Sequence, residues 1–213
     1  MYLPSHFSED RLDVLHDLIH QHPLASLVTM EAEGMTANHI PFIMAPPSAE
    51  APFGTLRGHV ARANPVWKNK TPVLLIFQGA SAYITPSWYE EKKQTGAVVP
   101  TYNYAVVHAH GYLKPVNKHE QFLQLLTQLT THFESQKQFP WKVSDAPKEY
   151  IENLMDNIVG IEIPVTRLIG KWKTSQNRST TNRSNIAIQL RDENNGSGCQ
   201  MADIIETQLF DKA

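Results

Sequence analysis

Two basic segments that lie far apart in the sequence hold the side chains most suited to binding an anion. They span residues 56–65 and 171–178. Each combines cationic side chains with amide or hydroxyl donors, a combination that recognises a phosphate dianion. The chain as a whole has a formal net charge of −2, so these cations are local clusters within a slightly acidic protein. The pattern predicts a site for a phosphate ester with an aromatic head group, and flavin mononucleotide (FMN) meets that description.

The first segment reads as a strand followed by a turn. Arg57 and His59 have the same strand parity, so both are predicted to face one pocket. The Asn64–Pro65 pair predicts a turn, which would bring backbone N–H groups and the Arg62 guanidinium to one place. The alternative is that these cations only protect a strand edge against aggregation.

The second segment alternates at period two. Lys171, Lys173 and Ser175 would therefore share one face of an extended chain, and Gln176 and Arg178 follow directly. A solvated basic strand edge is the alternative. We predict contact with the phosphate or with the edge of the flavin ring, and in a dimer this segment would reach the site of the partner chain.

His108 and His110 lie on one face of a predicted strand, at a spacing that lets two imidazoles share a metal ion. A metal site needs a third ligand, and no carboxylate lies near the pair in the sequence. We therefore predict no metal site, and expect a buried, hydrogen-bonded or flavin-facing pair.

For the aromatic residues and for possible catalytic residues, the sequence leaves alternative roles open. Some aromatic residues either fill the core or stack on the flavin ring. They are Tyr83, Trp88, Tyr102 and Tyr104. No acid–base pair and no nucleophile has a defining spacing, so the catalytic residues are unknown. If chemistry occurs, His39, His59 and His108 are the candidates for proton transfer.

The elements that must position these residues are mainly short strands. Apolar alternation and turn residues predict strands at residues 25–31, 36–44, 54–61, 73–78, 81–85, 103–113 and 158–165. Helices are predicted after Ser8, after a capping box at Asn117 and Glu120, over residues 146–157 and over residues 201–209. The arrangement indicates an α+β fold, an antiparallel barrel with attached helices. We predict a single domain, residues 1–213, with a helical insertion at about 117–157.

Composition narrows the setting. The single cysteine, Cys199, excludes an internal disulfide framework and suits a reducing compartment. No apolar run reaches membrane-spanning length, and the first residues lack the pattern of a signal peptide. These features predict a cytoplasmic protein with no membrane partner.

Several motifs, in order along nearly the whole chain, resemble the PaiB family. They are residues 1–7, 56–65 with Trp67, 76–79, 82–89, 99–104, 107–111 and 171–178. This family is known as FMN-binding negative transcriptional regulators of protease synthesis and sporulation. Its fold is similar to the FMN-binding split barrel of pyridoxamine phosphate oxidase, usually as a homodimer. The resemblance therefore implies an antiparallel split β-barrel with flanking helices, bound FMN and a homodimer.

In split barrels the strand and turn that correspond to residues 56–65 hold the flavin phosphate and ring edge, which implies contacts from Gly58, His59, Arg62 and Asn64. The full predicted set of FMN-binding residues is His39, Arg57, Gly58, His59, Arg62, Asn64, Tyr83, Trp88, Asn103, His108, Lys171, Lys173, Ser175, Gln176 and Arg178.

Promoter DNA as a partner rests on the resemblance alone. A helix-turn-helix needs a tight turn and a basic second helix. Here the predicted pair is joined by a long loop around residues 138–146, and the second helix carries Glu149, Glu152 and Asp156. The competing class is an enzyme, either a flavin-dependent oxidoreductase or a haem-handling protein, because split barrels serve these functions as well.

Overall fold

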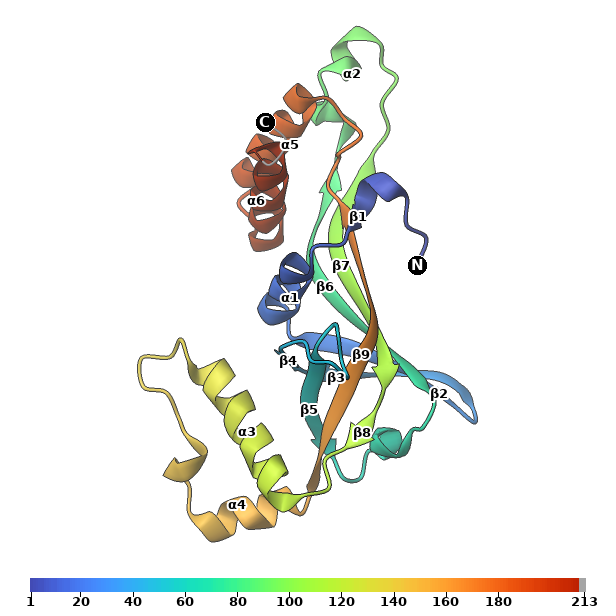
Figure 1. Cartoon of the computed structure of the whole chain (residues 1–213). Helices are drawn as coiled ribbons and strands as arrows, with labels where there is room; N and C mark the ends of the chain where they lie inside the picture. Colours follow the sequence, from blue (N-terminus) through green and yellow to red (C-terminus); the bar gives the residue numbers. More distant parts are fainter. Residues whose placement is uncertain (211–213) are drawn as a thin grey trace. The chain divides into compact units, whose positions relative to one another are not determined.

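The computed structural model describes residues 1–210, and its largest element is a nine-stranded sheet (Figure 1). The strand order is β3-β2-β6-β7-β9-β5-β4, and β1 and β8 each pair with β9. The strands are β1 (Ser8–Glu9), β2 (Leu24–Glu31), β3 (Gly34–Pro41), β4 (Ile43–Ala45), β5 (Thr55–Ala61), β6 (Pro72–Ile84), β7 (Thr101–Tyr112), β8 (Lys114–Pro115) and β9 (Ile158–Lys173). The pairings β2–β3, β2–β6, β4–β5 and β5–β9 are antiparallel.

The helices are α1 (Leu12–Gln21), α2 (Glu91–Gln94), α3 (His119–Glu134), α4 (Lys148–Met155), α5 (Thr180–Asp192) and α6 (Gly196–Phe210). Short 3₁₀ turns are η1 (Ser5–Phe7), η2 (Pro65–Lys68), η3 (Pro86–Trp88) and η4 (Val143–Asp145). Among residues 1–210, no helix combines the length and apolar character needed to cross a membrane. The predicted α+β class, an antiparallel sheet with flanking helices, is confirmed.

The described chain divides into two compact units. We call them the terminal unit (residues 1–14, 78–107 and from 169 onward) and the central unit (residues 15–77 and 108–168). Strands β6, β7 and β9 contribute residues to both. The first basic segment belongs to the central unit and the second to the terminal unit, so each is described within its own unit.

The central unit owes its core to strict alternation. Residues at every second position of its strands are fully buried: Ala25, Leu27, Leu56, Leu75, Phe77, Ala109, Ile161 and Ile163. Burying each large side chain contributes about 1.5–3 kcal/mol. Helix α3 buries Phe122, Leu125 and Leu129 at helical spacing, together with Met155 of α4. A Cβ on Gly160 would lie 2.7 Å from the Phe122 ring, so only glycine lets this helix approach β9 so closely.

The terminal unit contains a pair of helices, of which the sequence patterns predicted only one. Helices α5 and α6 pack against the end of β6 through Ile186, Leu190 and Ile205. Helix α6 is consistent with the prediction over residues 201–209, whereas α5 was missed. The buried residues of α5 lie on one face, but two of them, Asn182 and Arg183, are polar, so the apolar periodicity is weak. Ser179 provides an ordinary N-cap by accepting a hydrogen bond from the Asn182 N–H.

Several predicted boundaries were wrong. Strand β6 continues through Gly79 as one strand where two were expected, and β9 runs on to Lys173 instead of ending near residue 165. Helix α3 is preceded by Lys118 as N-cap without a side-chain hydrogen bond, so the predicted capping box does not form. The strand expected over 36–44 is interrupted at Phe42, where the chain leaves its pairing with β2 and begins to pair with β5 as β4.

Glycine at position 111 gives a direct test of the core. A Cβ there would lie 2.5 Å from the Pro164 carbonyl oxygen and 2.7 Å from Ile163 Cγ2. We expect Gly111→Ala to lower the free energy of unfolding by about 1–3 kcal/mol through overpacking. Gly196→Ala is the control, because no atom lies within 4 Å of its Cβ position and the change should stay within about 0.5 kcal/mol. Urea denaturation measures both, and equal effects would contradict the packing described.

Candidate functional site

The second basic segment lines a pocket of about 220 Å³ in the terminal unit. Its walls are Phe7, Tyr89, Val99, Pro100, Thr101, Asn103, Lys173, Ser175, Asn177 and Arg178. The wall contains two cations and no carboxylate. Among the described residues neither Lys173 nor Arg178 forms an ion pair, so the pocket is electrostatically suited to an anion.

A buried hydrogen-bonded pair shapes this pocket. Ser175 has a φ of 64°, a left-handed conformation that is uncommon outside glycine. Its hydroxyl exchanges hydrogen bonds of 3.0 and 3.2 Å with the amide group of Asn103, which is 1% exposed. The Arg178 N–H then donates to the Ser175 carbonyl at 2.9 Å. The chain therefore turns directly after β9, and Ser175, Asn177 and Arg178 line the pocket instead of continuing the strand.

The two lysines of β9 have different roles. The Nζ of Lys173 donates to Thr101 Oγ1 and to the Tyr102 carbonyl at the pocket wall. Burial lowers the pKa of Lys173, and the positive charge of Lys171 lowers it further. Lys171 is itself buried, donates to the Tyr2 carbonyl at 3.0 Å, and lies 5.3 Å from the centre of the Tyr104 ring. Lys171 thus acts on the pocket through its charge and does not line it.

Tyr89 is a pocket residue that the sequence did not reveal. Its side chain is 2% exposed, and the Arg178 guanidinium lies 4.8 Å from its ring centre. Its buried hydroxyl oxygen makes no hydrogen bond of normal geometry with a described residue. Burial raises the pKa of Tyr89 more than the neighbouring Arg178 and Ser175 side chains lower it, so the hydroxyl remains a proton donor. A buried donor without a partner costs about 1–3 kcal/mol, which an acceptor atom of a ligand would recover.

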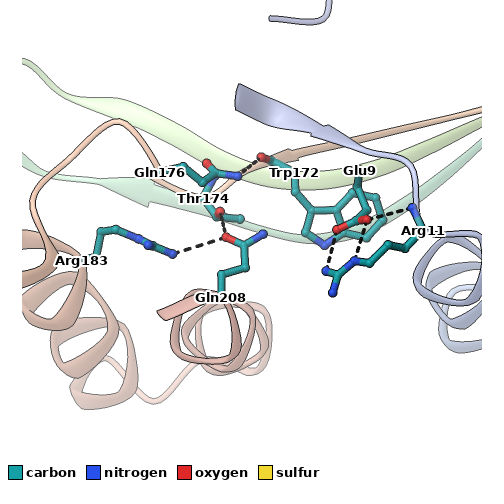
Figure 2. Close-up of polar contacts among 7 residues, drawn as sticks. All are labelled: Glu9, Arg11, Trp172, Thr174, Gln176, Arg183 and Gln208. Atoms are coloured by element: carbon teal, nitrogen blue, oxygen red, sulfur yellow. Dashed lines mark hydrogen bonds and ion pairs between the residues drawn. The ribbon is translucent and has the colours of Figure 1, made fainter. Parts of the chain in front are cut away.

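Polar contacts to residues outside the pocket wall hold the second basic segment in place (Figure 2). The Gln176 side chain donates to the Trp172 carbonyl and accepts from the Thr174 N–H at 2.8 Å. Thr174 donates through its hydroxyl to Gln208 on α6, which also accepts from the buried Arg183 on α5 at 3.4 Å. Gln176 is therefore engaged within its own segment, where the sequence predicted a flavin contact.

The predicted aromatic contacts separate into exposed and packed residues. Tyr83 and Tyr102 are 51% and 58% exposed, and their rings meet edge to face with centres 5.9 Å apart. Trp88 instead packs against the core formed by α5 and α6. Of these residues, the Tyr83 and Tyr102 rings are open to an aromatic ligand.

In the first basic segment Arg57 and His59 share a face, as their parity predicted. Their cross-strand partners are Glu162 and Gly160. Arg57 forms an ion pair with Glu162 at 2.8 Å and donates to Gln128 of α3 at 3.3 Å. Burial lowers the pKa of His59.

The glycine between them has a packing role. A Cβ on Gly58 would lie 2.9 Å from the Pro41 carbonyl oxygen and 3.0 Å from the Phe42 ring. Close packing of β5 against these residues is therefore enough to explain glycine at this position.

The turn after β5 forms where it was predicted. Asn64 accepts a hydrogen bond from the Val66 N–H at 3.0 Å and donates to Asn38 at 2.7 Å. The Arg62 guanidinium donates to the carbonyls of Asp156 and Ile158, at 2.6 and 3.0 Å. Arg62 thus satisfies carbonyls that follow α4, a favourable position for a cation.

The remaining predicted residues lie in the central unit. The Nδ1 of His39 on β3 lies 3.2 Å from the Ser26 hydroxyl. His108 on β7 is half-buried, and its burial lowers its pKa. His110 lies 3.0 Å from the Arg167 guanidinium. Among residues 1–210 no cluster of three potential metal ligands occurs.

Comparison with known proteins places the chain in a family. Residues 1–167 match the family described as "Putative FMN-binding domain". The chain belongs to this family. It is 30% identical over 212 residues to the "Protease synthase and sporulation protein PAI 2" of Bacillus subtilis, covering 98% of both chains. It is 32% identical over 241 residues to an uncharacterized protein of Emericella nidulans, covering 96% of both.

Solved structures of other proteins share the fold of this chain. The FAD and haem binding protein from Mycobacterium smegmatis matches with a TM-score of 0.59 at 12% identity, over 78% of this chain and 73% of its own. The flavocytochrome Anf3 from Azotobacter vinelandii matches with a TM-score of 0.58 at 10% identity, over 78% and 69%. The predicted antiparallel split barrel with flanking helices is confirmed, as is the resemblance to the PaiB family.

The charge of Lys171 provides a test of the pocket electrostatics. Removing this cation in Lys171→Met favours the protonated form of Lys173, so we expect the pKa of Lys173 to rise toward its ordinary value. A ¹³C NMR titration of the Lys173 Cε resonance measures the change. Lys93→Met, an exposed lysine of α2 in the same unit, should leave the pKa of Lys173 unchanged. An unmoved titration in Lys171→Met would show that the two charges do not interact.

Proposed function

We propose that this chain binds FMN and that the pocket lined by Lys173, Ser175 and Arg178 holds its phosphate. The observation that carries the proposal is one pocket with two cations, no carboxylate and the unpartnered buried hydroxyl of Tyr89. A phosphate dianion supplies the opposite charge and several acceptor oxygens. Membership of an FMN-binding domain family supports the same ligand.

Pocket size decides which part of the flavin lies inside. A pocket of about 220 Å³ is smaller than the roughly 300–1,000 Å³ of sites that enclose a whole small molecule. The phosphate end therefore enters the pocket and the isoalloxazine ring lies outside it. The exposed rings of Tyr83 and Tyr102 in the same unit provide a surface on which the flavin ring can stack. Bound flavin would supply electron-transfer chemistry.

We further propose that the protein is a cytoplasmic regulator and acts as a homodimer. In this dimer, the second basic segment of one chain completes the site formed by the first basic segment of its partner. The family resemblance and the named Bacillus subtilis relative support this role.

Helix α4 carries Glu149 and Glu152 and follows α3 only after residues 135–147, which is not the arrangement of a helix-turn-helix. We therefore propose that regulation of a promoter depends on flavin state or a partner protein. Sustained nicotinamide oxidation by the flavin-loaded protein would instead support an oxidoreductase.

Flavin binding is tested by comparing FMN with riboflavin, which lacks the phosphate. At FMN concentrations near 100 times its Kd we expect a stabilisation of about 2.7 kcal/mol. Lys173→Met should weaken FMN binding about 10- to 100-fold, the value of a charge-assisted hydrogen bond, and change riboflavin binding much less. Titration of flavin fluorescence measures both affinities.

The control for this comparison is Lys93→Met, which removes an exposed lysine of the same unit and should bind both flavins normally. An equal loss of FMN and riboflavin affinity in Lys173→Met would show that Lys173 does not bind the phosphate. If FMN does not raise the thermal stability of the wild-type chain, the proposal that the chain binds FMN is wrong.

The shared site is tested by complementation between two variants. His59→Ala alters the first basic segment and Lys173→Met the second, so each alone should bind FMN weakly. If each site uses one segment from each chain, mixed dimers contain one intact site, and refolding the two variants together should restore tight binding. Sedimentation velocity gives the oligomeric state. A monomer that binds FMN tightly, or a mixture that binds no better than its components, would contradict the shared site.

A further inference from the structure

The helical insertion of the central unit contains a groove of about 610 Å³ that the flavin proposal does not use. Its walls come from α3, from the segment around η4 and from α4: Leu123, Thr127, Thr131, Lys142, Val143, Ser144, Ala146, Lys148, Ile151 and Glu152. This volume falls within the range that encloses a small-molecule ligand.

Helix α3 has one face buried in the core and a second face that lines the groove. Phe122, Leu125 and Leu129 are buried in the core of the unit. Leu123, Thr127 and Thr131 follow one another at intervals of four residues, so they form a second stripe, and this stripe lines the groove. The groove is therefore a regular face of the helix, left open opposite η4 and α4.

The inner wall of the groove suits an apolar body. Leu123, Val143, Ala146 and Ile151 contribute hydrocarbon surface. The Thr127 hydroxyl donates to the carbonyl of Leu123 in its own helix at 2.8 Å, so its hydrogen is already used. An apolar chain or ring would gain hydrophobic contact here without leaving that donor unpaired.

The charges at the groove suit an anionic head group. Lys142 and Lys148 form no ion pair with any described residue. The only carboxylate in the wall belongs to Glu152, and it lies 2.6 Å from Nε2 of His119. Two lysine charges are thus available to a ligand, whereas the carboxylate has a partner.

We propose that this groove binds a small amphipathic carboxylate, a medium-chain fatty acid or an acid of similar size. The apolar wall holds the hydrocarbon and Lys142 and Lys148 bind the carboxylate. The site lies in the central unit and is separate from the phosphate pocket.

Isothermal titration calorimetry of the full chain with three probes of equal chain length tests the proposal: decanoate, decanol and decyltrimethylammonium. Decanoate should bind most tightly and the cation most weakly. Lys142→Met combined with Lys148→Met should weaken decanoate about 2- to 5-fold per lysine, the size expected for partly exposed ion pairs, and leave decanol unchanged. The matched control is Lys118→Met combined with Lys137→Met, which removes two exposed lysines of the same insertion that lie outside the groove and should change nothing.

A second variant tests the location. Thr127→Phe fills the groove from an exposed position of α3 and should abolish binding of decanoate and decanol while far-ultraviolet circular dichroism stays unchanged. Equal affinity for the anion and the cation, loss of binding in the control pair, or undiminished binding in a folded Thr127→Phe chain would each overturn the proposal. So would competition by FMN, or a Thr127→Phe chain that loses its dimer, because either would assign the groove to another occupant.

Discussion

The hydrogen bonds between Asn103 and Ser175 are the contact on which the candidate site depends. They join β7 to Ser175, the second residue after the end of β9, and hold it in a left-handed conformation, which would otherwise be unfavourable for serine. Without this turn the chain would continue as a strand, with alternate residues on opposite faces. With it, Ser175, Asn177 and Arg178 join Lys173 around one pocket.

Assembling two cations in a partly buried pocket without a carboxylate is unfavourable for the isolated chain. Burial and the neighbouring Lys171 both lower the pKa of Lys173, which records that cost. The unpartnered hydroxyl of Tyr89 adds to it. Polar groups left in this state are common at functional sites, where a ligand completes their interactions. A bound phosphate ester would supply the opposite charge for the cations and an acceptor for the hydroxyl, and FMN, the ligand in the family's description, is such an ester.

Local sequence patterns predicted much of this arrangement. Alternation located most of the strands, correctly predicted an extended chain at Lys171 and Lys173 without joining it to the strand over 158–165, and correctly gave Arg57 and His59 one face. Contacts between distant segments were beyond such patterns. Tyr89 packs on Arg178 from far away in the chain, and Arg62 pairs with backbone carbonyls that carry no side-chain signal. Helix α5 was missed because its mostly polar sequence is typical of a loop. Its packing against α6, a contact that local patterns do not predict, stabilises it as a helix.

A crystal structure of the chain with FMN bound tests the central claim most directly. The account predicts phosphate oxygens within hydrogen-bonding distance of Lys173 Nζ, the Arg178 guanidinium and the Tyr89 hydroxyl, with the isoalloxazine ring outside the pocket. A phosphate bound elsewhere, with none of these three groups in contact with it, would contradict it.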